Sequence, residues 1–250
     1  MRYFVQFSYF GEAYHGWQNQ PNAVTIQSVM EDAFSKLLGS PVSLTGAGRT
    51  DAGVHARQMF AHFEVDGIVD IDDFIYRTNA FLPKDIAIQA IFEVAPDAHS
   101  RFDAVARTYE YWVVTHKDPF MARGSHYIKH PLDLQKMNQA ASILLGYTDF
   151  ECFSKSNTDV KTYCCRITKA HWEWKNNTLV FTISADRFLR NMVRAIVGTL
   201  LEIGAGKREP EVIHTIIESR DRSNAGASVP AKGLYLTQVL YPDHIMEKHG

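Results

Sequence analysis

The sequence contains few cysteines, and their arrangement suggests neither a zinc site nor a disulfide framework. Its 250 residues include 3 cysteines, Cys152, Cys164 and Cys165. The number is odd and two of them are adjacent, which fits neither pattern. Free cysteines are typical of a reducing compartment, so we expect a cytoplasmic protein.

Long apolar runs and a strong charge of either sign are also missing. No run approaches the ~18 apolar residues of a membrane span, and the alternating start of the chain does not resemble a signal peptide. We therefore expect a soluble protein without a membrane partner. The formal net charge is −2, so a nucleic-acid partner would have to meet positive charge on one face or cleft. The 11 histidines show no ligand spacing, and we expect no metal site.

The first part of the chain predicts an α+β unit. Residues 2–9 alternate as a strand does, and apolar residues at helical spacing predict a helix that starts at an N-cap, Thr25, and stops at Gly39. Further elements are expected as strands at 42–46, 59–65 and 86–94 and a helix at 71–82. The order β-α-β-β-α-β is that of a split βαβ unit with a mainly antiparallel sheet.

A second cycle with a similar order follows, although no sequence repeat accompanies it. Its expected elements are a strand at 106–114, a helix at 132–145, hairpin strands at 167–174 and 179–185, helices at 188–203 and 211–218, and a strand at 234–241. We expect two domains, 1–104 and 105–250. No linker composition marks the boundary.

The stretch from Gly46 to Ala56 is the strongest candidate for chemistry. It contains three glycines around Arg49 and Asp51, and glycine suits sharp bends and close approach of the backbone to a ligand. In an extended segment, residues two apart point to the same side. An ionised Asp51 is suited to act as nucleophile, general base or metal ligand. The alternative is an ordinary loop in which Asp51 caps a turn.

Two arginines accompany the expected helix at 188–203. On a helical wheel, Arg194 falls about 90° from the centre of the apolar stripe, and Arg190 falls between Arg194 and that centre. An arginine at the edge of a core needs a partner if it is desolvated, and Asp51 is a candidate. Alternatively, the stems lie on apolar surface and the guanidinium groups reach water.

Aromatic residues lie near cations in the strand at 106–114 and, at Arg101-Phe102, just before it. Tyr109 lies close to Arg107, and an aromatic ring on a sheet can stack on a nucleic-acid base while an arginine holds phosphate. The alternative is that these rings belong to the core of the sheet.

Five stretches, in order, resemble motifs of the TruA family of tRNA pseudouridine synthases. They are Gly16-Trp17-Gln18-x-Gln20, the nine residues Gly48 to Ala56, Arg107 to Tyr111, Met192 to Gly198, and Pro230 to Leu236. The nine-residue loop is the most specific of these, and the matches span the whole chain.

The resemblance implies an isomerase that converts uridine to pseudouridine at positions 38, 39 and 40 of the tRNA anticodon stem-loop, without cofactor or metal. It implies an α+β fold of two ferredoxin-like (RRM-like) lobes that share a central, mainly antiparallel sheet flanked by helices, with the active-site cleft between the lobes. It also implies a homodimer that binds tRNA.

Four residues take the family's functional positions. By resemblance, Asp51 is the catalytic nucleophile, Arg49 binds the substrate nucleotide, Tyr109 stacks on the target base, and Arg194 is the ion-pair partner of Asp51. Three stretches depart from the family pattern without touching these positions: Phe10-Gly11-Glu12, Gln58-Met59 and Ser228-Val229.

Two other functions remain open from the sequence. A non-catalytic RNA-binding protein would use the same sheet and cleft but would need neither Asp51 nor Arg194. A carboxylate-based nucleoside or glycoside hydrolase usually needs two acidic groups ~5–10 Å apart. The stretch from Gly46 to Ala56, called the glycine loop below, offers one.

Overall fold

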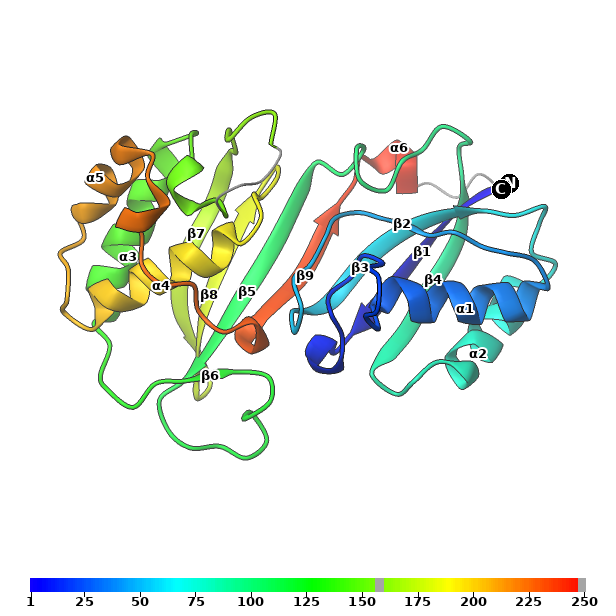
Figure 1. Ribbon diagram of the computed structural model, residues 1–250, viewed down its shortest axis with the longest axis horizontal. Helices are drawn as coiled ribbons and strands as arrows, with labels where there is room; N and C mark the ends of the chain where they lie inside the picture. The colour runs from blue at the N-terminus through cyan, green and yellow to red at the C-terminus, as the bar shows by residue number, and fades with distance from the viewer. Residues whose placement is uncertain (156–159, 247–250) are drawn as a thin grey trace. The chain divides into compact units, whose positions relative to one another are not determined.

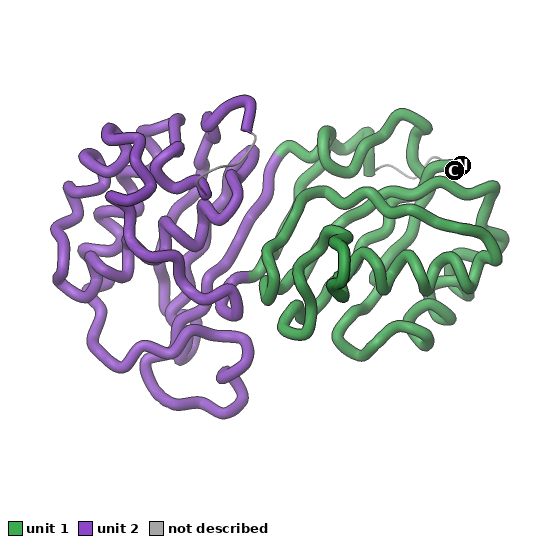
Figure 2. Tube along the Cα trace, viewed as in Figure 1, with its two compact units in different colours: residues 1–105, 235–250 green, residues 106–234 purple. Residues whose placement is uncertain are grey.

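The computed structural model describes residues 1–155 and 160–246. The chain forms two compact units (Figure 2). Unit 1 comprises Met1–Val105 and Tyr235–Gly250, and unit 2 comprises Ala106–Leu234. The first break lies close to the expected boundary at 104, but the C-terminal strand belongs to unit 1. As a statement about domains, the division into 1–104 and 105–250 stays a prediction.

Unit 1 has the expected order of strands and helices. Its elements are β1 (Arg2–Tyr9), η1 (Gly11–Ala13), α1 (Ile26–Leu38), β2 (Thr45–Gly46), β3 (His55–Glu64), α2 (Ile71–Phe81), β4 (Ile86–Val94), β9 (Leu234–Leu240) and α6 (Asp243–Met246). The strand order is β4-β1-β3, with antiparallel pairing, and β2 also pairs with β3. β9 runs parallel to β3 at His55 and Ala56, so the strand pairing is mixed but mostly antiparallel.

Helices α1 and α2 lie side by side over the strands of unit 1 (Figure 1). Thr25 caps α1 by accepting a hydrogen bond from the Ser28 backbone N–H, and Gly39 ends the helix in the left-handed conformation. Both ends of this helix are therefore confirmed. The Phe34 ring on α1 meets the rings of Phe63 and Phe74 edge-on, each 5.2 Å between centroids, and this contact ties the two helices to the sheet.

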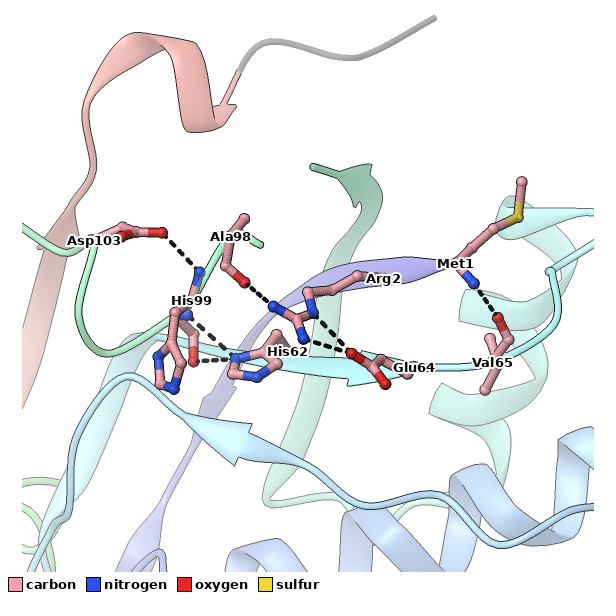
Figure 3. A network of polar contacts seen from close by, with 9 residues as sticks. Met1, Arg2, His62, Glu64, Val65, Ala98, His99 and Asp103 are labelled. Atoms are coloured by element: carbon pink, nitrogen blue, oxygen red, sulfur yellow. Dashed lines mark hydrogen bonds and ion pairs between the residues drawn. The ribbon is translucent and has the colours of Figure 1, made fainter. Parts of the chain in front are cut away.

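A polar network joins the segment after β4 to strands β1, β2 and β3 of the same unit (Figure 3). Arg2 donates to the Ala98 carbonyl at 2.9 Å and pairs with Glu64. The buried Ser100 donates its backbone N–H to His62 Nδ1 and its hydroxyl to the Thr45 carbonyl. This network fixes the course of residues 98–103 without a regular element.

Unit 2 repeats the pairing pattern of unit 1. Its elements are β5 (Ala106–Val114), β6 (His126–Tyr127), α3 (Leu134–Ile143), η2 (Leu144–Gly146), η3 (Glu151–Phe153), β7 (Ile167–Lys175), β8 (Thr178–Ala185), α4 (Met192–Gly204), α5 (Val212–Ser219), η4 (Arg222–Asn224) and η5 (Ala231–Gly233). β5 pairs with β8 and β8 with β7, both antiparallel. In the same way β1 pairs with β3 and β3 with β2. The second cycle predicted from the element order is present.

Several element boundaries differ from the sequence prediction. α4 begins at Met192 rather than at 188, because Asn191 adopts the left-handed conformation with φ of 66° and interrupts the helix. Arg190 therefore lies before the helix and is exposed. β3 begins at His55 rather than 59, and the strand expected at 42–46 is reduced to two residues.

None of the helices in the described ranges combines the length and the apolar character that crossing a membrane requires.

Candidate active site

The glycine loop connects β2 to β3 and contains a tight turn at Asp51. The Val54 backbone N–H donates to the Asp51 carbonyl at 3.2 Å. Gly53, the third residue of this turn, has φ of +78°, the value that a type II turn requires at that position. Asp51 is thus a turn residue through its backbone.

A second loop holds the glycine loop from the side. The Trp17 backbone N–H donates to the Thr50 carbonyl at 3.3 Å, and the Gly53 N–H donates to the Tyr14 carbonyl at 3.2 Å. Gly16, with φ of +85°, lies so close that a Cβ there would be 2.2 Å from the Thr50 carbonyl oxygen. Only glycine permits this contact, which explains why the Gly16-Trp17 motif accompanies the glycine loop.

Side chains complete the support. The Tyr9 hydroxyl shares a 2.8 Å hydrogen bond with the Thr50 hydroxyl. His55 is buried, and its Nδ1 accepts from the Gly11 N–H at 2.9 Å while its ring stacks on Phe10 at 4.0 Å. These bonds fix the residue before Asp51 and the far end of the loop.

The loop presents its two candidate residues differently. Arg49 is exposed, and Asp51 is partly exposed. A candidate reactive residue on an anchored backbone is the arrangement expected of a preorganised site.

Tyr109 lies in unit 2, in the middle of β5. It pairs with Ile183 across the β5–β8 ladder, and its ring meets Phe188 edge-on at 5.2 Å with an interplanar angle of 89°. Phe188 was expected inside a helix, but it belongs to the loop that leads into α4. The Tyr109 ring is partly exposed, as an aromatic ring that receives a base has to be.

Arg194 lies on the first turn of α4, at the edge of the core as predicted. It is partly buried, its Nε donates to the Val229 carbonyl at 2.7 Å, and its own carbonyl accepts from the Val229 N–H. The Tyr111 hydroxyl donates to the next carbonyl, that of Pro230, at 2.9 Å. Burial raises the pKa of Tyr111, so it remains a neutral donor. The arginine is thus fixed by backbone contacts on the segment before β9.

Each departure from the family pattern has a role in the structure. In the first stretch, the Phe10 ring stacks on His55 at 4.0 Å. Gln58 accepts a hydrogen bond from the Val239 N–H of β9. The Ser228 hydroxyl accepts from the Asn191 and Arg222 side chains at 2.6 and 2.9 Å.

The cysteines do not offer a competing nucleophile in the core. Burial raises the pKa of the Cys152 and Cys165 thiols to about 12, and a protonated buried thiol is inert. Among residues 1–155 and 160–246, no group of three or more His, Cys, Asp or Glu side chains is placed to hold a metal ion.

The predicted residues fall into two groups. Arg49 and Asp51 share one loop of unit 1, whereas Tyr109 and Arg194 lie in unit 2. The contacts by which Tyr9, Tyr14 and His55 hold the glycine loop were not predictable from the sequence, because periodic patterns carry no information about contacts between loops. The fragment Gly16-Trp17 was the available signal for this support.

The α+β scaffold therefore presents an anchored loop with Asp51, a strand with Tyr109 and a helix with Arg194. The chain belongs to the tRNA pseudouridine synthase family. The model of that family matches residues 6–103 and 140–242. Arg49, Asp51 and Arg194 lie within the matched stretches, and Tyr109 lies between them.

Individual relatives match over nearly the full length. The tRNA pseudouridine synthase A of Bacteroides fragilis is 50% identical over 248 residues, which are 98% of this chain and 98% of that protein. The protein of the same name from Parabacteroides distasonis is 49% identical over 98% of this chain and 97% of its own. That of Acetivibrio thermocellus is 43% identical over 93% of this chain and 96% of its own.

Proposed function

We propose that the protein isomerises uridine to pseudouridine at positions 38, 39 and 40 in the anticodon stem-loop of tRNA. Membership of the tRNA pseudouridine synthase family supports the reaction, and the relatives of similar length are named for it. The choice of positions rests on the resemblance of the motifs to the TruA family.

The reaction makes modest chemical demands. The bond between ribose C1′ and uracil N1 breaks, the base turns, and C1′ bonds to C5, while C5 loses a proton and N1 gains one. Asp51 is the nucleophile of this proposal. It is suited to attack C1′ or add to C6 of the base, or to act as a base on the C2′ proton.

The observation that carries the proposal is the anchoring of the glycine loop. The backbone on both sides of Asp51 is held by Trp17, Tyr14 and its own turn, and the residue is partly exposed. A loop that needed only to turn would not require the close approach of Gly16 to Thr50.

The other three residues have roles that the substrate explains. A uridine inside a stem has to leave the base stack, which costs a few kcal/mol. In the proposal, the exposed Arg49 holds the displaced nucleotide, and stacking on Tyr109 contributes about 1–3 kcal/mol. In the same proposal, Arg194 is the ion-pair partner of Asp51.

The same proposal includes the arrangement of the chain. We propose two ferredoxin-like lobes, 1–104 and 105–250, that share a sheet and form the cleft between them, in a cytoplasmic homodimer. The pairing pattern common to β1–β3 and to β5, β7 and β8 supports the repeated lobe. The free cysteines support the compartment.

Replacement of the carboxylate tests the function. Asp51→Asn keeps the size and polarity of the side chain but removes its charge, so we expect turnover to fall by at least about a hundredfold while tRNA binding persists. Tritium release from tRNA labelled at uridine C5 measures turnover, because C5 loses its hydrogen in the reaction.

The matched control is Asp66→Asn, which removes one exposed carboxylate from the β3–α2 loop of the same unit. It is expected to behave as the parent protein does. Undiminished pseudouridine formation by Asp51→Asn would refute the assignment of Asp51. Binding of tRNA without any turnover by the parent protein would favour the non-catalytic RNA-binding alternative.

A further inference from the structure

A surface hollow of about 380 Å³ adjoins the glycine loop within unit 1. Strands β1, β3 and β4 contribute to it, together with one residue near the start of β9. Its lining includes Ser8, Arg57, Lys84, Ala87 and Tyr235. None of these residues has a role in the chemistry proposed for Asp51.

Small side chains create the hollow. Ser8 on β1 and Ala87 on β4 are cross-strand partners, and neither fills the space above the sheet. Phe34 of α1 packs on Phe63, which pairs with Tyr3 of β1. Because side chains alternate along a strand, Ser8 points to the opposite face from Tyr3. The hollow therefore lies on the face turned away from α1 and α2.

Two cations line this hollow. Arg57 and Lys84 are exposed, and the Arg57 guanidinium lies over the Tyr235 ring, 5.8 Å from its centroid. Contact with an aromatic face orients an arginine. The Gln89 amide, which also lines the hollow, donates to the Arg57 carbonyl at 3.4 Å.

The carboxylate in the lining already has a partner. Asp85 accepts a 2.6 Å hydrogen bond from the Tyr14 hydroxyl, and its carbonyl accepts from the Phe10 N–H. Burial and the neighbouring Asp85 raise the pKa of Tyr14, so the hydroxyl stays a donor. Arg57 and Lys84 together outweigh this single acidic group.

The hollow is coupled to the catalytic loop by short contacts. Tyr9 also lines the hollow, and its hydroxyl, which the same alternation places on the α1 side of β1, bonds to the Thr50 hydroxyl next to Asp51. Phe10, also in the lining, stacks on His55 at the end of the glycine loop. A ligand group in the hollow would therefore be placed relative to the carboxylate by a rigid part of unit 1.

We infer that Arg57 and Lys84 bind a backbone phosphate of the RNA substrate beside the target nucleotide. The inference rests on the proposed function, to which it adds two positioning residues. A nucleotide taken out of its stack needs its backbone held as well as its base, and phosphate contacts fix register without reading sequence. A site open to the surface suits a phosphate that remains part of a chain.

The first test removes the two charges together, in Arg57→Ala/Lys84→Ala. We expect KM for tRNA to rise by about 10-fold or more while kcat changes little. The slope of log K against log salt should become shallower by about 1–2, since each lost phosphate contact removes roughly one unit. The control is Arg77→Ala/Lys36→Ala, which removes the same charges from exposed positions on α2 and α1.

A second variant leaves the charges in place and fills the space. Ala87→Leu puts a larger apolar side chain into the exposed floor of the hollow. It is expected to weaken RNA binding without changing the overall charge. Circular dichroism and thermal unfolding confirm that the variant is folded.

The decisive test neutralises single phosphates. Anticodon stem-loop RNAs carrying one methylphosphonate at each linkage in turn are bound to the parent protein and to the double variant. We expect one linkage next to the target uridine at which neutralisation weakens binding by the parent protein several-fold but leaves the double variant unaffected.

Equal losses in both proteins at every linkage would overturn the inference, as would a double variant with the parent's KM and salt slope. These outcomes leave the proposed function intact if the parent protein still forms pseudouridine. Failure of the parent protein to form it would instead refute the proposed function, so the two failures are distinguishable.

Discussion

Gly16 shows how a residue without a side chain can fix the loop that carries a candidate catalytic residue, Asp51. Its backbone is left-handed, and the Thr50 carbonyl occupies the space where a Cβ would be. The neighbouring Trp17 N–H can therefore reach that carbonyl, and its ring covers Gly46, where a Cβ would lie 2.4 Å from the indole Nε1. Two glycines and one tryptophan thus lock the two loops together.

Gly16→Ala is expected to separate these loops. Both the strained φ and the contact with the Thr50 carbonyl oppose the substitution, so we expect a loss of about 2–3 kcal/mol in stability and a larger fall in kcat than in tRNA affinity. Urea unfolding and steady-state kinetics measure the two effects.

The control is Gly39→Ala at the end of α1. It has a similar φ of +72°, but a Cβ there meets nothing within 4 Å. It should cost about 1 kcal/mol through strain alone and leave kcat unchanged. Equal effects of the two substitutions would show that backbone strain, not the contact with Thr50, accounts for the behaviour of Gly16.

At this scale the sequence predicts candidate functional residues, and the structure adds the contacts that hold them. Asp51 and Arg49 stood out because glycines surround them, and Arg194 was placed at the core edge by helical geometry, which the structure confirms. The pairing of Asp51 with Arg194 stays a prediction. The acceptor role of His55 was not predictable, because its partner Gly11 is 44 residues away.

At the scale of elements, α4 is the helix that fixes Arg194, and at Gly198 it packs directly against backbone. A Cβ at Gly198 would lie 1.8 Å from the Ala227 carbonyl oxygen. The Thr199 hydroxyl accepts from the Gly226 N–H at 2.9 Å. The segment at 225–229 therefore lies directly on the helix and supplies the carbonyl that holds the Arg194 guanidinium.

Gly198→Ala tests this packing. In an open helix the change would stabilise by about 1 kcal/mol, but here we expect destabilisation by about 1–3 kcal/mol and reduced turnover, because the Arg194–Val229 contact is displaced. Thermal unfolding and tritium release provide the readouts.

For comparison, Glu218→Ala changes an exposed position on α5 and should stay within about 0.5 kcal/mol of the parent protein. A Gly198→Ala protein as stable and active as the parent would contradict the proposed contact.

The elements were predictable where local chemistry decides them. Thr25 and Gly39 mark the ends of α1 through capping, and the Asn176-Asn177 pair forms the turn between β7 and β8, with Asn176 at φ of 54°. The start of α4 was not predictable, because the apolar pattern runs through Asn191 without a break. In the structure, Phe188 lies before α4 and packs on Tyr109 instead of continuing the helix.

At the scale of the molecule, the polar network around His62 makes the free energy of unfolding depend on pH. Burial and then the neighbouring His99 and Arg2 lower the pKa of His62 to about 4, although Glu64 and Asp103 act in the opposite direction. The unfolded chain binds this proton near pH 6.5, whereas the folded chain does not. Stability is therefore retained above pH 6.5 and falls as the pH decreases from there towards 4.

Between pH 7 and pH 5 this single group should lower the free energy of unfolding by about 2 kcal/mol. His62→Asn keeps an acceptor near the Nδ1 position for the Ser100 N–H but cannot titrate, so its stability should fall less over this interval. Urea unfolding at both pH values measures the difference. The exposed His15→Gln, also in unit 1, should keep the parent's dependence, and an unchanged dependence in His62→Asn would contradict the assignment.

The position of β9 beside β3 has a consequence during synthesis. Gln58 and Val239, which a hydrogen bond joins, are 181 positions apart in the chain. At roughly 5–20 residues per second, a ribosome needs roughly 10–40 s to make the intervening chain. For that time the edge of β3 at His55 and Ala56 lacks its parallel neighbour, and an unpaired edge invites the wrong strand. The nascent chain therefore carries the stretch from Gly46 to Ala56 before the strand that pairs with the edge of β3.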